Sequence, residues 1–228
     1  TWSDSVIDLQ GKALWLHSSG GSGKTSLDGQ GKRRVINCPR ADNGGEIRIE
    51  GFTVTGGSLA EGNGAGMRIG PFAEPVVTEC VLFGNLTNGY GGAVFIDTNA
   101  APLFEDCSFE YNSAHSGGAV HGSLCEATFT SCVFSTNYAS VDGGAIVCNA
   151  QGEMTFHECS FLANNAIGNG GAVCVVAYSA VKVTGSTIND DVGGEGSGGL
   201  HEYNYSTISY GSSTCCGNYP ADCVTLLG

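Results

Sequence analysis

One pattern dominates this chain: a short apolar motif returns about every 27 residues. Its central position, a cysteine in the middle copies, falls at residues 52, 80, 107, 132, 159 and 186, so the steps are 28, 27, 25, 27 and 27 residues. A second motif, Gly-Gly-Ala followed by Val or Ile, keeps the same period and begins at Gly91, Gly117, Gly143 and Gly170. Such self-similarity predicts a stack of equivalent structural units.

The repeat unit is made of short β-type stretches bounded by glycine and asparagine, and it lacks an amphipathic helical pattern. Glycine accounts for 37 of the 228 residues, but without the every-third-residue spacing of collagen. Three short strands and three turns fit into one rung of a solenoid, with rungs about 4.8 Å apart, and crossovers between parallel strands are right-handed. The sequence therefore predicts an all-β fold, a right-handed single-stranded parallel β-helix of about eight rungs with about 27 residues and three short strands in each.

A single β-helix domain is predicted over residues 1–228. Residues 1–45 contain apolar stretches around Leu14 and Val35 and are expected to start the first rungs, and residues 46–209 carry the regular repeats. An unpaired terminal rung invites strand addition by another chain. Residues 210–228 are therefore expected to fold over the other end as a cap.

The two motifs resemble those of the right-handed parallel β-helix superfamily, which includes the pectate-lyase-like proteins. The repeated Gly-Gly-Ala-Val and Cys-x-Phe-x-x-Asn patterns are most similar to those of extracellular repeat proteins such as the chlamydial polymorphic outer-membrane proteins. Phe109–Asn112, Phe134–Asn137 and Phe161–Asn164 fit the second pattern, whereas Leu82–Asn85 departs from it at the Phe. The resemblance covers about residues 46–209 and implies the fold and an extracellular or cell-surface location. Because the superfamily contains lyases, hydrolases, adhesins and phage tailspikes, it leaves the activity open.

Alternation along each predicted strand separates inward from outward side chains. The cysteines at residues 80, 107, 132 and 159 share one inward position and are expected to be buried free thiols, because in-register neighbours do not offer disulfide geometry. The alanines of the second motif and the five histidines are expected to face solvent. The outward rows beside the second motif carry the most varied chemistry, and they form a candidate ligand-binding strip of Arg68, Phe95, Asp97, His121, Asn149, His201 and Tyr203.

Two covalent features are predicted outside the ladders. Cys223 can form a disulfide with either Cys215 or Cys216, which would staple the C-terminal end of the solenoid. Of the two Asn-x-Ser/Thr sequons, Asn204 is the candidate for glycosylation, because Asn85 belongs to a predicted inward asparagine row.

Composition excludes several functions. Nine basic against 22 acidic residues give a net charge of −13, which argues against a nucleic-acid partner, and no apolar run is long enough for a transmembrane segment. No catalytic residues, cofactor site or metal-ligand set is predicted. The turns between the asparagine row and the glycine doublets measure about four to seven residues, too short to be expected to wall a cleft.

The predicted function is therefore a noncatalytic extracellular or surface-exposed β-helix, a scaffold or adhesion module. It would bind a glycan or protein partner on a flat face, or build a larger assembly with neighbouring domains or subunits. A polysaccharide-active enzyme, a pectate-lyase-like lyase or a glycoside hydrolase, is the alternative. An ice-binding protein is the third candidate, although the outward threonines at Thr53 and Thr55 are not continued on later rungs.

Overall fold

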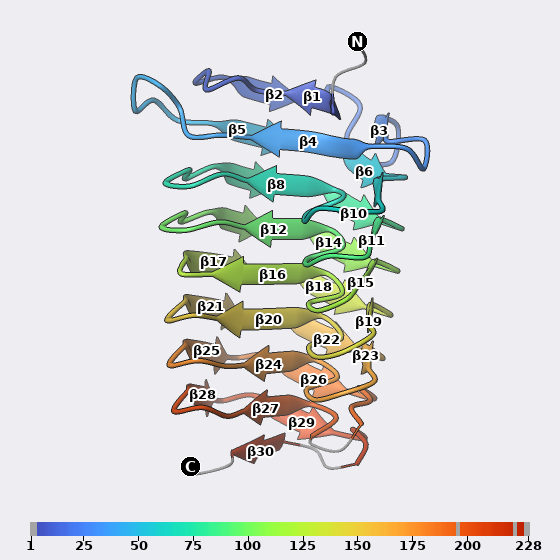
Figure 1. The fold of residues 1–228 in the computed structure, drawn as a ribbon, viewed down its shortest axis with the longest axis vertical. Helices are drawn as coiled ribbons and strands as arrows, with labels where there is room; N and C mark the ends of the chain where they lie inside the picture. The colour runs from blue at the N-terminus through green and yellow to red at the C-terminus, as the bar shows by residue number, and fades with distance from the viewer. Residues whose placement is uncertain (1–3, 195–196, 221–222, 226–228) are drawn as a thin grey trace.

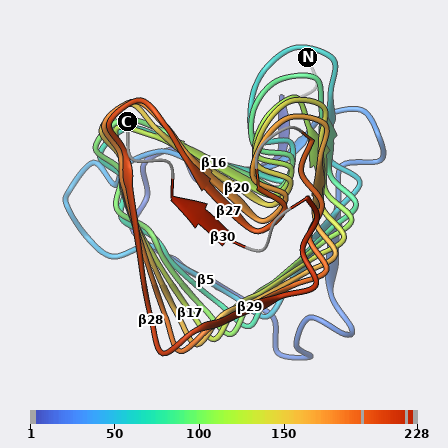
Figure 2. The same cartoon turned by 90° about the horizontal axis from the view of Figure 1, so that it is seen from below.

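The computed structural model describes residues 4–194, 197–220 and 223–225, and these residues form only strands, bridges and turns. The strands stack into a solenoid that runs from β1 and β2 at the N-terminal end to β30 at the C-terminal end (Figure 1). Viewed along its axis, three sheets enclose the interior (Figure 2). The predicted all-β parallel solenoid of about eight rungs, with three strands per rung, is confirmed.

We name the three long sheets A, B and C, and a fourth, shorter sheet D. Sheet A, with nine strands, contains β1 (Ser5–Asp8), β4 (Arg34–Cys38), β8 (Met67–Ile69), β12 (Val94–Ile96), β16 (Val120–Ser123), β20 (Ile146–Asn149), β24 (Val173–Val175), β27 (Leu200–Glu202) and β30 (Cys223–Thr225). Sheet B contains β2 (Trp15–His17), β5 (Arg48–Glu50), β9 (Val76–Thr78), β13 (Leu103–Glu105), β17 (Glu126–Thr130), β21 (Glu153–His157), β25 (Ala180–Thr184) and β28 (Thr207–Gly211).

Sheet C contains β3 (Ser26–Asp28), β6 (Thr53–Thr55), β10 (Val81–Phe83), β14 (Ser108–Glu110), β18 (Val133–Ser135), β22 (Ser160–Leu162), β26 (Thr187–Asn189) and β29 (Thr214–Cys216). Sheet D was not expected, and its two-residue strands are β7 (Ser58–Leu59), β11 (Leu86–Thr87), β15 (Ser113–Ala114), β19 (Tyr138–Ala139) and β23 (Asn165–Ala166). The strand pairs are parallel and in register with the sequence repeat: Val81, for example, pairs with Thr53 on one side and Ser108 on the other.

Phenylalanine rings fill the interior as two parallel stacks. Phe109, Phe134 and Phe161 from sheet C are fully buried, and successive ring centroids lie 4.6 and 4.9 Å apart. Phe129 and Phe156 belong to the stack from sheet B, with centroids 4.9 Å apart, and their rings meet the sheet C rings edge to face. The one-rung repeat of the sequence thus places identical rings at stacking distance.

A ladder of side-chain amides lines the corner after sheet C. Asn137 is typical: its Nδ2 donates to the Phe109 carbonyl and to Asn164 Oδ1, each at 2.9 Å. Its own Oδ1 accepts from the backbone N–H and the Nδ2 of Asn112, both at 3.1 Å. Each amide therefore satisfies buried backbone groups and joins two rungs. The inward asparagine row is confirmed.

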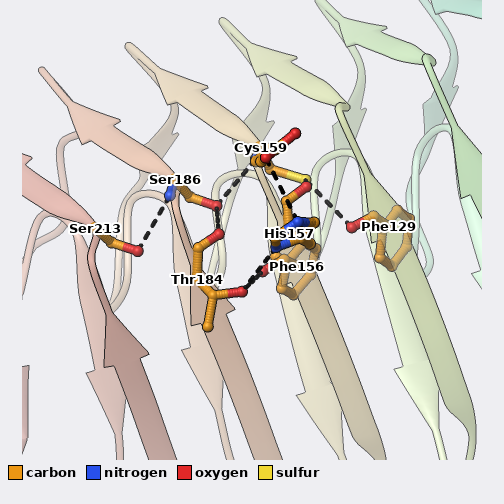
Figure 3. Close-up of polar contacts among 8 residues, drawn as sticks. Phe129, Phe156, His157, Cys159, Thr184, Ser186 and Ser213 are labelled. Carbon is orange, nitrogen blue, oxygen red and sulfur yellow. Dashed lines mark hydrogen bonds and ion pairs between the residues drawn. The ribbon is translucent and has the colours of Figure 1, made fainter.

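The cysteine row occupies the corner between sheets B and C, and its four thiols are buried and free as predicted. Cys159 Sγ lies 3.4 Å from the His157 carbonyl and 3.5 Å from the Phe129 carbonyl (Figure 3). On the next rung Ser186 takes the same place, accepting from the Cys159 N–H at 2.9 Å and donating to the Thr184 carbonyl. Burial raises the pKa of the Cys80 thiol to about 11, so this thiol is structural rather than reactive.

One residue per rung turns the chain from sheet C to the asparagine row in a left-handed conformation. Gly84 does so with φ of 64°, but Thr136 occupies the equivalent position with φ of 55°. Left-handed backbone costs a residue with a Cβ atom about 1–2 kcal/mol, and Thr136 is also β-branched.

Replacing Thr136 by glycine is expected to raise the free energy of unfolding by about 0.5–1 kcal/mol, because relief of this strain exceeds the entropy that glycine adds to the unfolded chain. Urea unfolding measures the change. Thr128, an exposed threonine within β17, provides the matched control, and Thr128→Gly should lower stability. A loss of stability in both variants would contradict the strain argument.

Two expectations about the fold are corrected. The strands β28, β29 and β30 pair in parallel with β25, β26 and β27, so the described part of residues 210–228 extends the stack instead of folding over its end as a cap. The alanines of the second motif, expected to face solvent, are fully buried at Ala93, Ala119, Ala145 and Ala172. They are buried because sheet D and the connections that follow it lie against this side of sheet A, as the close approach of Ser113 to Gly92 shows.

Candidate functional site

The outward face of sheet A provides the floor of a groove. Strand register places the side chains of Arg68, Phe95, His121, Val147, Cys174 and His201 in one row, each on the next rung. A second row, two residues further along each strand, includes Asp97, Ser123, Asn149 and Tyr203. All seven residues of the predicted ligand-binding strip belong to these two rows.

The wall of the groove comes from the connections that lead from sheet D back to sheet A. Figure 2 shows them as arches that project beside the sheet containing β16, β20 and β27. The space has a volume of about 370 Å³ and is lined by Asn63, Tyr90, Phe95, His115, Ser116, His121, Ser123, Val141, Asp142, Val147, Asn149, Val176 and Tyr203. The expectation that these short turns cannot wall a cleft was wrong, because one turn per rung adds up along the stack.

Aromatic rings line the N-terminal half of the groove. His121 stacks on Tyr90 with ring centroids 4.7 Å apart and an interplanar angle of 27°, and on Phe95 at 5.9 Å and 18°. The His121 side chain is not solvent-facing as expected, since only 4% of the residue is exposed. Desolvation lowers the pKa of His121 to about 4, so the imidazole is neutral at physiological pH. Its Nδ1 atom has no hydrogen-bond partner among the described residues.

Asp142 is the carboxylate of the groove wall, and several donors hold it in place. Its Oδ1 accepts from the backbone N–H of Asn169 at 2.7 Å and from Asn169 Nδ2 at 3.2 Å. Its Oδ2 accepts from the Tyr203 hydroxyl at 3.4 Å, which links the wall to the floor. Asp142 is the only acidic side chain among the described residues that line this groove.

The seven residues of the predicted ligand-binding strip lie in three different environments. Phe95, His121, Asn149 and Tyr203 come together as lining residues. Arg68 and Asp97 pair with each other, with Arg68 Nη2 2.7 Å from Asp97 Oδ2, in the same two rows but not among the lining residues.

His201 is nearly buried beside Tyr203, with ring centroids 5.5 Å apart, and its expected exposure was therefore also wrong. Desolvation lowers the pKa of His201, while the charge of Asp142 opposes this shift. His17, His115 and His157 are exposed as expected.

The residues that form the wall of the groove were not predicted from the sequence. Asn63, Tyr90, Ser116, Asp142 and Asn169 each directly precede the first glycine of a copy of the second motif. That glycine has a positive φ, 65° at Gly91, and this conformation turns the chain from the wall into sheet A. The signal was thus present as a third periodic row, one residue before each glycine doublet.

The remaining predicted sites lie apart from the groove. Cys215 is disulfide-bonded, whereas Cys216 is a free, exposed thiol. Of the two cysteines predicted as alternatives, Cys215 therefore forms the disulfide. The side chain of Cys223 lies outside the described residues. Asn204 is exposed, and Asn85 is fully buried. Within the described ranges, no cluster of His, Cys, Asp and Glu could hold a metal ion, and no helix is long and apolar enough to span a membrane.

The fold and the sequence repeat together define a right-handed parallel β-helix protein. The family model described as a right-handed beta helix region matches residues 25–214, and the chain belongs to this family. Neither the curated proteins nor the solved structures contain a match to the chain.

Proposed function

We propose that this protein is a noncatalytic extracellular adhesion module that binds a neutral glycan in the groove beside sheet A. The observation that carries the proposal is the aromatic cluster of Tyr90, His121 and Phe95, stacked along the groove next to amide and hydroxyl side chains. Sugar rings present apolar C–H faces and many hydroxyl groups. Ligand sites of this kind combine apolar and aromatic surface with a few polar groups that fix orientation.

The charge of the groove favours a neutral ligand. His121 is uncharged near neutral pH, and Asp142 is the only formally charged carboxylate among the described lining residues. A negatively charged sugar would bind less favourably beside this carboxylate, because like charges repel more strongly where solvent is partly excluded. The amides of Asn63 and Asn149 can both donate to and accept from hydroxyl groups.

The noncatalytic assignment rests on the same set of side chains. Glycosidases of the two-carboxylate type use an acid and a second carboxylate on either side of the scissile bond. The described lining residues supply Asp142 alone, and its Oδ1 is already occupied by Asn169. The extracellular location rests on the resemblance of the repeats to extracellular repeat proteins and on the disulfide at Cys215.

Tyr90→Ala should weaken binding of a neutral oligosaccharide by about tenfold, because it removes one exposed face of the aromatic cluster. A glycan array of neutral and acidic oligosaccharides identifies the ligand, and isothermal titration calorimetry gives the affinity. Tyr178→Ala, at another exposed tyrosine that does not line the groove, is the control and should bind like the wild type.

Three results would overturn this proposal. Equal loss of affinity in both tyrosine variants would show that the glycan does not bind in the groove. Release of shortened or unsaturated products from a polysaccharide panel, with and without Ca²⁺, would make the protein an enzyme. Thermal hysteresis without glycan binding would make it an ice-binding protein.

A further inference from the structure

We propose a second binding site, for an oxyanion, at the N-terminal end of the solenoid. A cavity at this end has a volume of about 710 Å³ and is lined by Asp4, Gln30, Lys32, Arg33, Arg34, Leu59 and Glu61. It shares no lining residue with the groove beside sheet A. The site is therefore distinct from the proposed glycan site.

The lining of this cavity is positively charged, whereas the whole chain is negatively charged. The whole chain carries −13 from nine basic and 22 acidic residues, yet three of the nine basic residues are consecutive here. The described lining residues carry three cations and two carboxylates, Asp4 and Glu61, which gives them a formal charge of +1. A positive cavity in an acidic protein concentrates anions where the rest of the surface repels them.

Two cations of this cavity, Lys32 and Arg34, form no ion pair with any described residue. Among the described residues, neither Lys32 nor Arg34 lies within 4.0 Å of a carboxylate oxygen. Arg34 is half-buried, and desolvation and the neighbouring Arg68 charge lower its pKa more than the charges of Asp4 and Asp8 raise it. A bound anion would offset both the desolvation of the guanidinium and its repulsion from Arg68, because it places a negative charge beside a partly desolvated cation.

Hydrogen bonds hold the Arg34 guanidinium in a defined position. Its Nε donates to the Gly64 carbonyl at 3.0 Å and its Nη2 to the Asn63 carbonyl at 2.9 Å. These bonds occupy the Nε edge of the guanidinium, and its two Nη1 hydrogens and second Nη2 hydrogen remain as donors to which a sulfate, phosphate or carboxylate group can bind at two points. Lys32 is exposed and contributes a mobile positive charge to the same cavity.

The ligand chemistry is therefore an oxyanion, and its source is either a free inorganic anion or an ester on a larger molecule. Calorimetric titrations with inorganic sulfate, inorganic phosphate, a sulfated disaccharide and the same disaccharide without sulfate distinguish these sources. Tighter binding of the sulfated disaccharide than of inorganic sulfate identifies an ester-bearing glycan, and equal binding identifies the free anion. The unsulfated disaccharide should not bind at this cavity.

Lys32→Glu should weaken anion binding by about tenfold, since it removes one cation and adds a like charge. Lys24→Glu is the matched control, because Lys24 is also exposed but does not line the cavity, and its reversal changes the net charge equally. Arg33→Gln is a second variant inside the cavity that should act in the same direction. Far-ultraviolet circular dichroism and the melting temperature establish that each variant is folded.

Two outcomes would overturn the proposal: no saturable binding of any of the anions to the wild type, or equal weakening in Lys32→Glu and Lys24→Glu. The second outcome would mean that anions respond only to net charge. The test is separate from that of the glycan groove, because Tyr90→Ala should leave sulfate binding unchanged and Lys32→Glu should leave binding of neutral oligosaccharides unchanged.

Discussion

Asp191→Asn is expected to stabilise the protein by about 4 kcal/mol at pH 8. Asp191 is fully buried and stands where earlier rungs place asparagine in the amide ladder. Its Oδ1 accepts from the Asn164 backbone N–H at 2.7 Å and from Asn164 Nδ2 at 2.8 Å. Its Oδ2 has no hydrogen-bond partner among the residues that the structure describes.

The repeat explains why this oxygen is orphaned. At the asparagine positions of the ladder the corresponding atom is an Nδ2, as in Asn164, where it donates to the Phe134 carbonyl at 3.0 Å. A carboxylate oxygen at the same position meets acceptors where an amide would donate, so only the protonated acid can complete the ladder. Asparagine restores the missing donor without a change of shape.

The stabilisation of the protein by Asp191→Asn should increase as the pH rises. Burial raises the pKa of Asp191 from 3.8 to about 7. Between these values the folded protein retains a proton that the unfolded chain has released, so wild-type stability falls by up to about 1.4 kcal/mol per pH unit as pH rises, and the loss is complete above about pH 7. Below pH 4 the variant and the wild type should have similar stability.

Urea unfolding of both proteins at pH 4, 6 and 8 measures this difference. Asp190→Asn makes the same chemical change at the neighbouring exposed residue and should shift stability by no more than a few tenths of a kcal/mol. If the Asp191→Asn curve keeps the pH dependence of the wild type, Asp191 is not the group that titrates in the folded state.

The interior of this fold was predictable because one residue of register determines a whole ladder. Once Cys107 and Cys132 are aligned in the sequence, Phe109 and Phe134 must stack and Asn112 and Asn137 must join, as the structure shows. These contacts are between identical residues on adjacent rungs, so the period alone specifies them.

The groove was predictable only in part, because its wall depends on packing between segments that the period does not place. Phe95 and His121 were correctly assigned to the outward face of sheet A, but their burial against Tyr90 was not foreseen. One signal was available. An outward position that faces water tolerates any polar residue, whereas the alanines at Ala93 and Ala119 indicate a covered surface with little room.

The two halves of the glycine doublet have different tasks. The first, such as Gly143 with φ of 66°, turns the chain out of the wall connection. The second, Gly144, lies where β23 of sheet D approaches the start of a sheet A strand. A Cβ atom there would stand 2.2 Å from the Gly171 carbonyl oxygen and 2.6 Å from the Asn165 backbone nitrogen. Close approach of two backbones, not conformational freedom, requires the second glycine.

Gly144→Ala should therefore lower the free energy of unfolding by about 3 kcal/mol, because backbone atoms on both sides must move to admit one methyl group. In the same variant the wall that carries Asp142 should shift from sheet A, so affinity for a neutral glycan should fall together with stability. Gly211→Ala adds the same methyl group at a position with no atom within 4 Å, and it should leave both quantities nearly unchanged. Urea unfolding and calorimetric glycan titration measure the two effects. If Gly144→Ala were as stable as Gly211→Ala, the wall would not be held against sheet A by this contact, and the groove would lose the rigid geometry on which its proposed function depends.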